Sequence, residues 1–298
     1  MVTPVICSTN YKGGVGKTTT SRVLAQALAL DEKFTKGKPI LIIDLDPQGN
    51  TSRRWQLLRT MEDGSSYPIP HPLLKDEMPD HSSACDLWLS IIVKDGGGES
   101  FLPVPYETSN PKIHVVPAHE VLMSRAISVP LEDRPMLGSA LRRWLRSEDV
   151  ASTYCCVIID TQPSKSSLID AALAAATHVY VPFIPEPQSV EGVFSIISYI
   201  AMQQQSRGDD VPLTMLGLLP NMVTKTTLHS IHLRALQNDP VFGRYLMPVR
   251  FARRIGYSET DDYRNSPGQV TDLHGPHGTP ISIEAKKFAK YIAGRLNS

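Results

Sequence analysis

The sequence predicts an α/β fold built around a parallel sheet that helices cover on both faces. Continuous apolar runs, of which residues 40–45 (ILIIDL) are the clearest, alternate along the chain with segments of helical periodicity. Strands that are buried on both faces have such unbroken runs, whereas strands with one solvated face alternate. Polar residues capable of chemistry follow directly at the ends of several runs, which is expected where strand ends form a crevice.

The composition suits a folded chain with a sizeable core. Of the 298 residues, 41% are hydrophobic, and 30 basic residues balance 30 acidic ones. Any affinity for nucleic acid must therefore come from a local patch. The cysteines lack metal-ligand spacing and indicate reduced core thiols: Cys7, Cys85, Cys155 and Cys156. We find no signal peptide and no run near the roughly 20 apolar residues of a membrane span, so we expect a cytoplasmic protein that needs no membrane.

The first predicted strand, residues 2–7, leads into a glycine-rich turn, and a helix is expected over 17–30. Glycines let the backbone approach an anion closely, and the N–H groups of the turn and helix start point at it. Lys17 can neutralise the β- and γ-phosphates, and the Thr18 hydroxyl can ligate Mg²⁺. The predicted nucleotide-binding residues of this cradle are Gly13, Gly14, Val15, Gly16, Lys17, Thr18 and Thr19.

The second predicted strand ends in the string DLDPQGN, residues 44–50. Successive side chains of a strand face opposite ways, so Asp44 and Asp46 lie on the same side. Both could face the Mg²⁺–phosphate region at the carboxyl ends of the strands. A solvated acidic turn is the alternative for either aspartate alone.

The segment at about 53–111 differs in composition from the rest. It holds seven prolines, a run of three glycines, and nine acidic against five basic residues. We expect loops packed on a single domain that spans residues 1–298, with one helix near 85–93, because few periodic apolar positions support a second core. A system-specific contact surface and a functionless elaboration are both compatible with this composition.

The remaining elements continue the alternation of strands and helices. A strand at 154–160 ends in Asp160, where a carboxylate can bind Mg²⁺ through water. The other expected strands cover 112–118, 178–184 and 213–220. The other expected helices cover 131–148, 166–176, a stretch through about 204, 226–237 and 281–296.

Three motifs together resemble those of ParA/MinD-type ATPases. The phosphate-binding loop departs from the strict pattern G-x-x-x-x-G-K-[ST], because Tyr11 stands where that pattern has its first glycine. Instead a second lysine, Lys12, opens the string KGGVGKT. This string resembles the deviant Walker A motif of that family. DLDPQGN resembles its A′ motif. IIDTQPS resembles its Walker B strand and switch, with Gln162 replacing a proline. The resemblance covers about 1–50 and 112–298 and is closest to Soj-like ParA partition ATPases without an N-terminal DNA-reading domain.

The resemblance implies a doubly wound P-loop fold and a Mg²⁺-dependent ATPase that is slow until a partner stimulates it. It implies that Lys12 reaches the nucleotide of the other subunit in an ATP-dependent homodimer, while Lys17 and Asp46 act in their own subunit. It makes Asp46 the residue that orients the attacking water. It places Thr18, Asp44 and Asp160 around the metal, and Asn221 and the Pro248 region around the adenine.

The output surface is expected on the C-terminal third. Residues 225–264 carry seven Lys or Arg against four Asp or Glu. The resemblance assigns DNA binding to Lys225, Arg250, Arg253 and Arg254. Such a patch would bind phosphates without reading bases, so its affinity should fall steeply with salt. A solvated basic face is the alternative.

Four functions fit these features. The leading one is a ParA-like ATPase that segregates or positions a plasmid, chromosome or protein cargo on the nucleoid, stimulated by a ParB-like or other adaptor. The second is a MinD-like membrane-positioning ATPase, which would need an amphipathic C-terminal anchor. The third, an iron–sulfur electron donor, would need a cysteine just after Asp160, and 165–169 has none. The fourth is a regulatory module without ATPase activity.

Overall fold

A seven-stranded sheet forms the centre of the computed structural model, which describes residues 2–93, 98–205, 207, 212–259 and 279–296. The strand order is β5-β6-β2-β7-β1-β8-β9, and every neighbouring pair is parallel except β5 with β6. This confirms the predicted doubly wound, mostly parallel sheet. Its strands are β1 (Val5–Ser8), β2 (Ile40–Leu45), β5 (Tyr106–Glu107), β6 (Ile113–Val116), β7 (Cys156–Thr161), β8 (His178–Phe183) and β9 (Thr214–Pro220).

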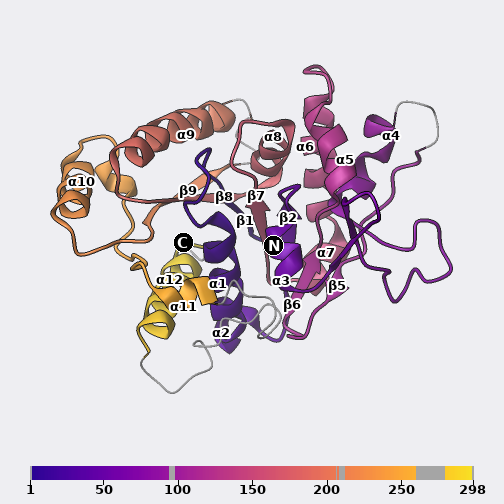
Figure 1. Cartoon of the computed structure of the whole chain (residues 1–298), viewed down its shortest axis with the longest axis horizontal. Coiled ribbons are helices and arrows are strands. Elements are labelled where there is room, and N and C mark those ends of the chain that lie inside the picture. Colours follow the sequence, from indigo (N-terminus) through magenta and orange to yellow (C-terminus); the bar gives the residue numbers. More distant parts are fainter. Residues whose placement is uncertain (1, 94–97, 206, 208–211, 260–278, 297–298) are drawn as a thin grey trace.

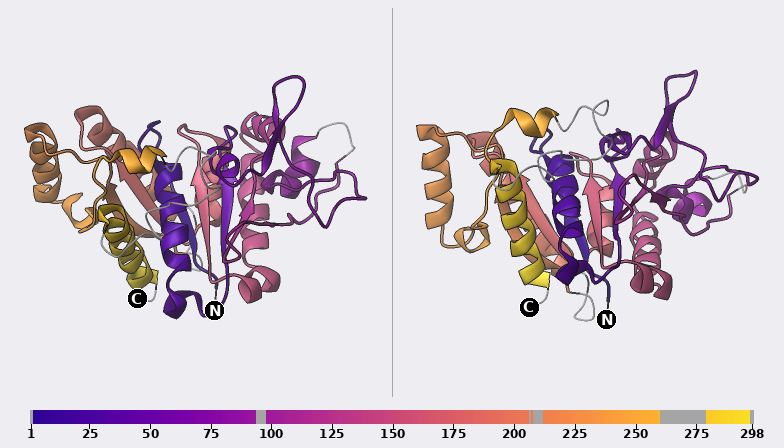
Figure 2. Two further views of the ribbon diagram at one scale, coloured as in Figure 1. Left: turned by 60° about the horizontal axis from the view of Figure 1, so that its bottom comes forward. Right: turned by 90° about the horizontal axis from the view of Figure 1, so that it is seen from below.

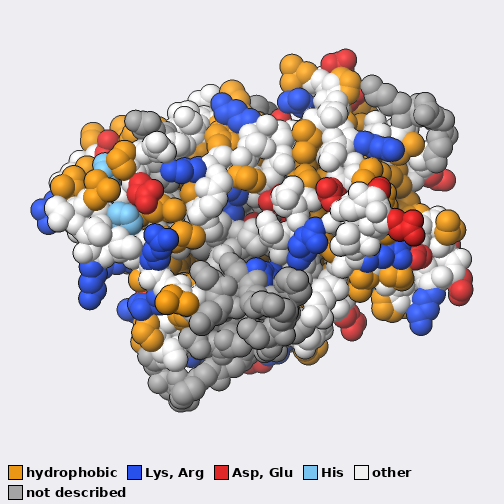
Figure 3. Space-filling model, in the orientation of Figure 1, with side chains coloured by type: hydrophobic (Ala, Val, Ile, Leu, Met, Phe, Trp, Pro, Cys, Tyr) orange, Lys and Arg blue, Asp and Glu red, His pale blue; other side chains and the backbone are white. Residues whose placement is uncertain are grey.

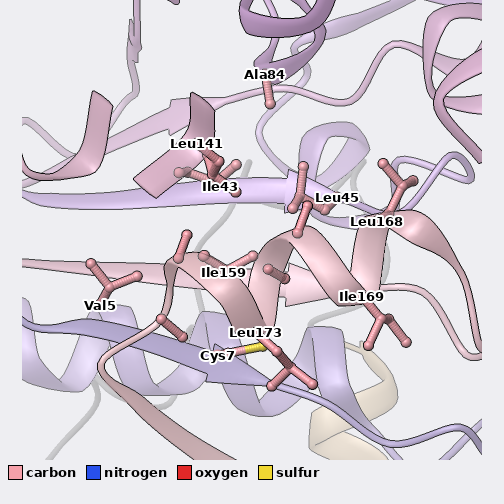
Figure 4. Packing of buried hydrophobic residues seen from close by; sticks show 14 of the residues in the cluster. Val5, Cys7, Ile43, Leu45, Ala84, Leu141, Ile159, Leu168, Ile169 and Leu173 are labelled. Atoms are coloured by element: carbon pink, nitrogen blue, oxygen red, sulfur yellow. The ribbon is translucent and has the colours of Figure 1, made fainter. Parts of the chain in front are cut away.

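Helices cover both faces of this sheet. Figure 1 shows α6 (Arg134–Leu145), α8 (Ser167–Ala175) and α9 (Pro187–Gln205) above it, and α1 (Lys17–Ala29) and α12 (Pro280–Leu296) below. The strand residues alternate between two buried clusters, one under each helical layer. Figure 4 shows part of the first cluster, where α8 lies over the strands that carry Cys7, Leu45 and Ile159.

The shorter helices lie in the connections. They are α2 (Glu32–Thr35), α3 (Asn50–Arg54), α4 (Leu89–Ile92), α5 (Glu120–Ile127), α7 (Glu148–Thr153), α10 (Thr227–Asn238) and α11 (Ile255–Glu259), with 3₁₀ helices η1 (Ala84–Trp88) and η2 (Gly243–Tyr245). The helix expected over 131–148 is α6, which is shorter at both ends, and α7 was not expected; Ser147 has an extended backbone between them and its side chain caps the start of α7. In the part of the chain that the structure describes, no helix is long and apolar enough to cross a membrane.

The proline- and glycine-rich segment packs on the sheet domain through a small set of buried side chains. It contains η1, α4 and a two-stranded hairpin of β3 (Leu58–Thr60) and β4 (Ser66–Pro68). Trp88 is fully buried and donates its indole N–H to the Leu137 carbonyl of α6 at 3.0 Å. Figure 2 shows the hairpin at the edge of the molecule opposite the two chain ends, which is the edge where the parallel strands end.

A bulge in β9 shifts the register in which this strand pairs with β8. The pairing of β8 with β9 shifts between Val179 and Tyr180, which pair with Met215 and Gly217. Gly217 has a φ of 143°, and a Cβ there would lie 2.6 Å from the Tyr245 carbonyl oxygen. Glycine is therefore required both for the backbone conformation and for the close approach of Tyr245.

We expect Gly217→Ala to lower the free energy of unfolding by roughly 1–3 kcal/mol, because it adds backbone strain and a contact with a carbonyl group that cannot move aside. Gly294→Ala is the matched control, since it lies in α12 with nothing within 4 Å of the added Cβ. It should change stability by less than about 1 kcal/mol. Urea unfolding of both variants measures the difference, and equal effects would contradict the role assigned to the bulge.

Candidate active site

The loop between β1 and α1 forms one wall of a cavity at the carboxyl ends of the strands. Gly14 and Gly16 have φ values of 71° and 86°, which only glycine adopts without strain. A Cβ on Gly16 would also lie 2.2 Å from the Asn221 side chain. The cavity has a volume of about 340 Å³ and is lined by Gly14, Gly16, Lys17, Thr18, Thr19, Asp46, Asn50, Arg54, Pro163 and Met222.

Lys17 lies against its own loop. Its Nζ donates to the Lys12 carbonyl at 3.0 Å, and the residue is 6% exposed. Burial lowers the pKa of Lys17 to about 8, although the nearby carboxylates of Asp160 and Asp46 act in the opposite direction. The ammonium group is thus positioned at the cavity, and an anion there would stabilise its charged form.

Asp160 is the penultimate residue of β7 and is fully buried next to the cavity lining. Thr51 donates its hydroxyl to Asp160 Oδ2 at 2.8 Å, and hydrogen bonding to the Thr18 side chain also favours the charged carboxylate. Burial outweighs both hydrogen bonds and raises the pKa of Asp160 to about 6. A cation near Asp160 and the Thr18 hydroxyl would relieve this cost, and oxygen donors of this kind are those that Mg²⁺ prefers.

Magnesium at this position would need ligands beyond the protein. Within the described ranges, no cluster of three or more His, Cys, Asp or Glu side chains is arranged to hold a metal ion. Mg²⁺ keeps several waters and commonly shares ligands with substrate phosphates. The residues present therefore fit a Mg²⁺ ion that arrives with a phosphorylated ligand.

The two aspartates at the end of β2, Asp44 within the strand and Asp46 directly after it, have different environments. Asp44 Oδ1 accepts from Asp46 N at 3.2 Å, and Asp44 Oδ2 accepts from the backbone N and the hydroxyl of Ser52 at 2.8 and 2.7 Å. Burial, followed by the charges of Asp160 and Asp46, raises the pKa of Asp44 to about 8. Asp46 lines the cavity and is 6% exposed. Only Asp46 borders the cavity, whereas the hydrogen bonds of Asp44 tie the end of β2 to α3.

The Asn221 amide connects the end of β9 to the phosphate loop. Its Nδ2 donates to the Val15 carbonyl at 2.8 Å, and its Oδ1 accepts from Met222 N at 2.9 Å. Both ends of the amide are therefore engaged within the protein. Asn221 also borders a second cavity of about 210 Å³, next to the first, which it shares with the apolar side chains of Val23, Phe251 and Tyr257.

This second cavity suits the flat ring of a base. Thr19 and Met222 line both cavities, so a ligand could extend from one into the other. Pro248, which the sequence associates with the base, does not line the second cavity and borders a different one. Phe251 and Tyr257 were missed from the sequence, although they lie just beyond Pro248.

Lys12 lies on the loop but does not line its cavity. Its backbone N donates to Asn10 Oδ1 at 3.0 Å, and its side chain is half-buried. Asn10 in turn donates to the Pro182 carbonyl at 2.9 Å, which anchors the start of the loop to β8. Asn10, Thr51, Ser52 and Arg54 were also missed from the sequence. The polar pair Thr51 and Ser52, directly after DPQGN, is the signal that could have found two of them.

The basic side chains of the C-terminal third gather around a groove beside α10. The groove has a volume of about 1040 Å³ and includes Lys225, Arg234, Arg250 and Arg254 in its walls. Figure 3 shows Lys and Arg side chains over this end of the molecule. Arg254 is paired with Glu284 at 2.9 Å, and Arg253 is exposed beside the second cavity. Ala252 and Arg254 line both the groove and the second cavity.

Comparisons with known proteins identify the relatives of this chain. The family described as "AAA domain" matches residues 3–212. The chromosome-partitioning ATPase Soj of Thermus thermophilus is 30% identical over 98% of this chain and 96% of its own, and the chromosome partitioning protein ParA of Myxococcus xanthus is 31% identical over 73% and 64%. The structure of cobyrinic acid a,c-diamide synthase from Mycobacterium smegmatis with bound ADP and magnesium is 25% identical, with a TM-score of 0.63 over 99% of this chain and 96% of that one.

We expect the affinity for ATP to weaken as the pH rises from about 7.5 to about 9.5, approaching tenfold per pH unit above the Lys17 pKa of about 8. The sign follows from the lowered pKa: below it Lys17 is already charged, and above it the free protein must take up a proton to bind the phosphates. Calorimetry at about pH 8.5 in buffers of different ionisation enthalpy should detect this proton uptake. Lys17→Arg should remove it, and binding by the unaltered protein without proton uptake would contradict the role of Lys17.

Proposed function

The chain belongs to the Soj/ParA family of partition ATPases, and on that basis we propose that it binds Mg²⁺-ATP, dimerises on it, holds DNA without sequence preference and positions a cargo through stimulated hydrolysis. One observation carries the proposal most directly. Lys17, Thr18 and Asp46 line one cavity, and the buried Asp160 is hydrogen-bonded to the Thr18 side chain. Phosphoryl transfer depends mainly on positioning and charge stabilisation, and these residue types supply both.

Each residue has a role in this scheme. Lys17 and the loop N–H groups bind the phosphates, and Thr18 and Asp160 hold Mg²⁺ directly or through its waters. Bound Mg²⁺ would neutralise charge on the β- and γ-phosphates. Asp46 orients the attacking water. Asp44 supports this arrangement from behind, because its hydrogen bonds fix Ser52 and the Asp46 backbone.

Dimerisation follows from the second lysine. The side chain of Lys12 does not line the cavity of its own subunit, which supports a role at the nucleotide of the other subunit. A nucleotide shared by two subunits stabilises the dimer that binds it, by mass action. The adenine would occupy the second cavity between Val23, Phe251 and Tyr257, with Asn221 at its border and the segment after Pro248 forming its far wall.

DNA would bind the basic surface beside α10. Lys225, Arg250 and Arg253 are exposed, and Arg254 keeps part of its surface accessible while paired with Glu284. A dimer carries this surface twice, so ATP would control DNA binding through avidity. In the cell the ATP-bound protein would then be cytoplasmic and associated with the nucleoid, and a ParB-like or other adaptor would stimulate its release.

Lys17→Ala should abolish ATP hydrolysis and weaken nucleotide binding, because it removes the main positive charge that binds the phosphates. Lys12→Ala should retain most nucleotide binding but lose hydrolysis and the ATP-dependent dimer. Nucleotide titration, phosphate release and light scattering distinguish the two variants. Normal hydrolysis by Lys12→Ala would show that the site is complete within one subunit.

Arg250→Glu combined with Arg253→Glu should abolish ATP-dependent DNA binding and, where binding remains measurable at low salt, reduce its salt dependence. The matched control is Arg143→Glu with Arg146→Glu, which makes the same charge change at two exposed positions, one in the last turn of α6 and one directly after it. Fluorescence anisotropy with an unrelated duplex measures both, and liposome sedimentation tests the MinD-like alternative in parallel. Equal losses of DNA affinity in the two double variants would indicate a general charge effect. Absence of DNA binding by the ATP-loaded protein would refute the proposed use of the nucleoid.

A further inference from the structure

The phosphate cavity contains a second cationic residue that its motifs do not account for. Arg54 lines this cavity together with Lys17, Asp46 and Asn50. Asn50 and Arg54 stand one helical turn apart on α3, so their side chains share one face of that helix. α3 begins directly after Gly49, whose φ of 61° turns the chain from the end of β2 into the helix.

The orientation of α3 is fixed from two sides. Ser52 donates through its backbone N and its hydroxyl to Asp44, and its hydroxyl oxygen accepts from Ala118 N at 2.9 Å. Thr51 donates its hydroxyl to Asp160 on β7. The helix is thus bonded to the ends of two sheet strands and to the chain after β6. A side chain carried on an anchored helix is positioned more precisely than one on a loop.

The neighbouring Arg53 shows that position on α3 decides the role of each arginine. Its Nε donates to the Gln48 carbonyl at 3.2 Å and its Nη2 to the Ser66 hydroxyl at 2.5 Å. These bonds connect α3 to the β3–β4 hairpin, and Arg53 does not line the phosphate cavity. Of the two adjacent arginines, Arg54 is the one that faces the place where phosphates would lie.

The charges around the cavity define what Arg54 can recognise. Asp46 and Asp160 contribute negative charge near Lys17. A nucleoside triphosphate carries a γ-phosphate, and thus further negative charge, that a diphosphate lacks. A guanidinium presents its N–H donors in a planar fork that matches two phosphate oxygens. During phosphoryl transfer the charge spreads over the equatorial oxygens of the transferred group, where such a donor stabilises the transition state.

We propose that Arg54 binds the γ-phosphate of the nucleotide held by its own subunit, so that it favours ATP over ADP and stabilises the transition state of hydrolysis. This rests on the proposed ATPase function. It adds to the shared lysine Lys12 a cation that comes from within the subunit. In this scheme α3 carries both Ser52, which anchors the helix to Asp44, and Arg54, which donates to the γ-phosphate.

The test measures hydrolysis and nucleotide binding separately in Arg54→Ala, Arg54→Lys and the distant exposed control Arg143→Ala. Arg54→Ala should lower kcat about 10²–10³-fold, the effect typical of losing one preorganised donor. Its affinity for a non-hydrolysable ATP analogue should fall about tenfold, while its affinity for ADP changes less than about threefold. Arg54→Lys should recover part of the analogue affinity but little of kcat, because the fork geometry is lost. Arg143→Ala should match the unaltered protein.

Two outcomes overturn the inference. Unaltered kcat in Arg54→Ala would show that Arg54 does not touch the reacting phosphate. Equal losses of ATP-analogue and ADP affinity, together with a lower unfolding temperature, would show a structural role for Arg54. Full recovery of kcat by Arg54→Lys would instead support a contact with the reacting phosphate that acts through charge and not through the planar fork. If the unaltered protein hydrolyses no ATP with DNA present, the proposed ATPase function fails, and the ratio of analogue to ADP affinity still decides whether Arg54 reads the γ-phosphate.

Discussion

The structure of the site depends on the burial of three neighbouring carboxylates. The parallel pairing of β2 with β7 places Asp44 beside Asp160, and Asp46 follows two residues later. Burial makes their negative charges costly and raises the pKa of all three; the charge of Asp46 further raises the pKa values of Asp44 and Asp160, and the charge of Asp160 further raises that of Asp44. The hydroxyl and N–H donors of Thr51 and Ser52, the buried Lys17 and the anchoring of α3 all offset this cost. The site is therefore arranged to gain free energy when cations enter with a ligand.

The sequence predicted the six parallel strands of the sheet and most helices because their signals are local, but it missed the two-residue strand β5. Unbroken apolar runs identify strands buried on both faces, and helical periodicity identifies the layers between them. The break between α6 and α7 depends on one cap at Ser147, which interrupts no periodicity. The two-stranded hairpin escaped prediction because β3 and β4 have three residues each, too few for a periodic signal. Trp88 reaches the core through a contact with α6, far away in sequence.

The sequence also brought Lys17, Thr18 and Asp46 to one place, because motif spacing and strand alternation are enough to do so. It could not assign the work that Asp44 and Asn221 do, since each is decided by partners from other segments. The Asn221 amide bonds Val15, 206 residues earlier. Arg54 and Tyr257 belong to no motif, and only the packing of α3 and the course of the chain after β9 show what they face. Roles carried by a motif were thus accessible, and roles created by tertiary contact were not.

A single segment of the chain forms the wall between the base cavity and the groove beside α10. Ala252 and Arg254 face both sides of it, and Glu284 of α12 holds it by accepting from Arg254 and from the Tyr257 hydroxyl, each at 2.9 Å. A ligand that shifts this wall from one side would change the affinity for a ligand on the other side, and such a coupling is reciprocal in free energy. If a nucleotide strengthens the binding of an anionic ligand in the groove, that ligand must strengthen nucleotide binding by the same free energy. This coupling needs only the one segment of chain that borders both cavities.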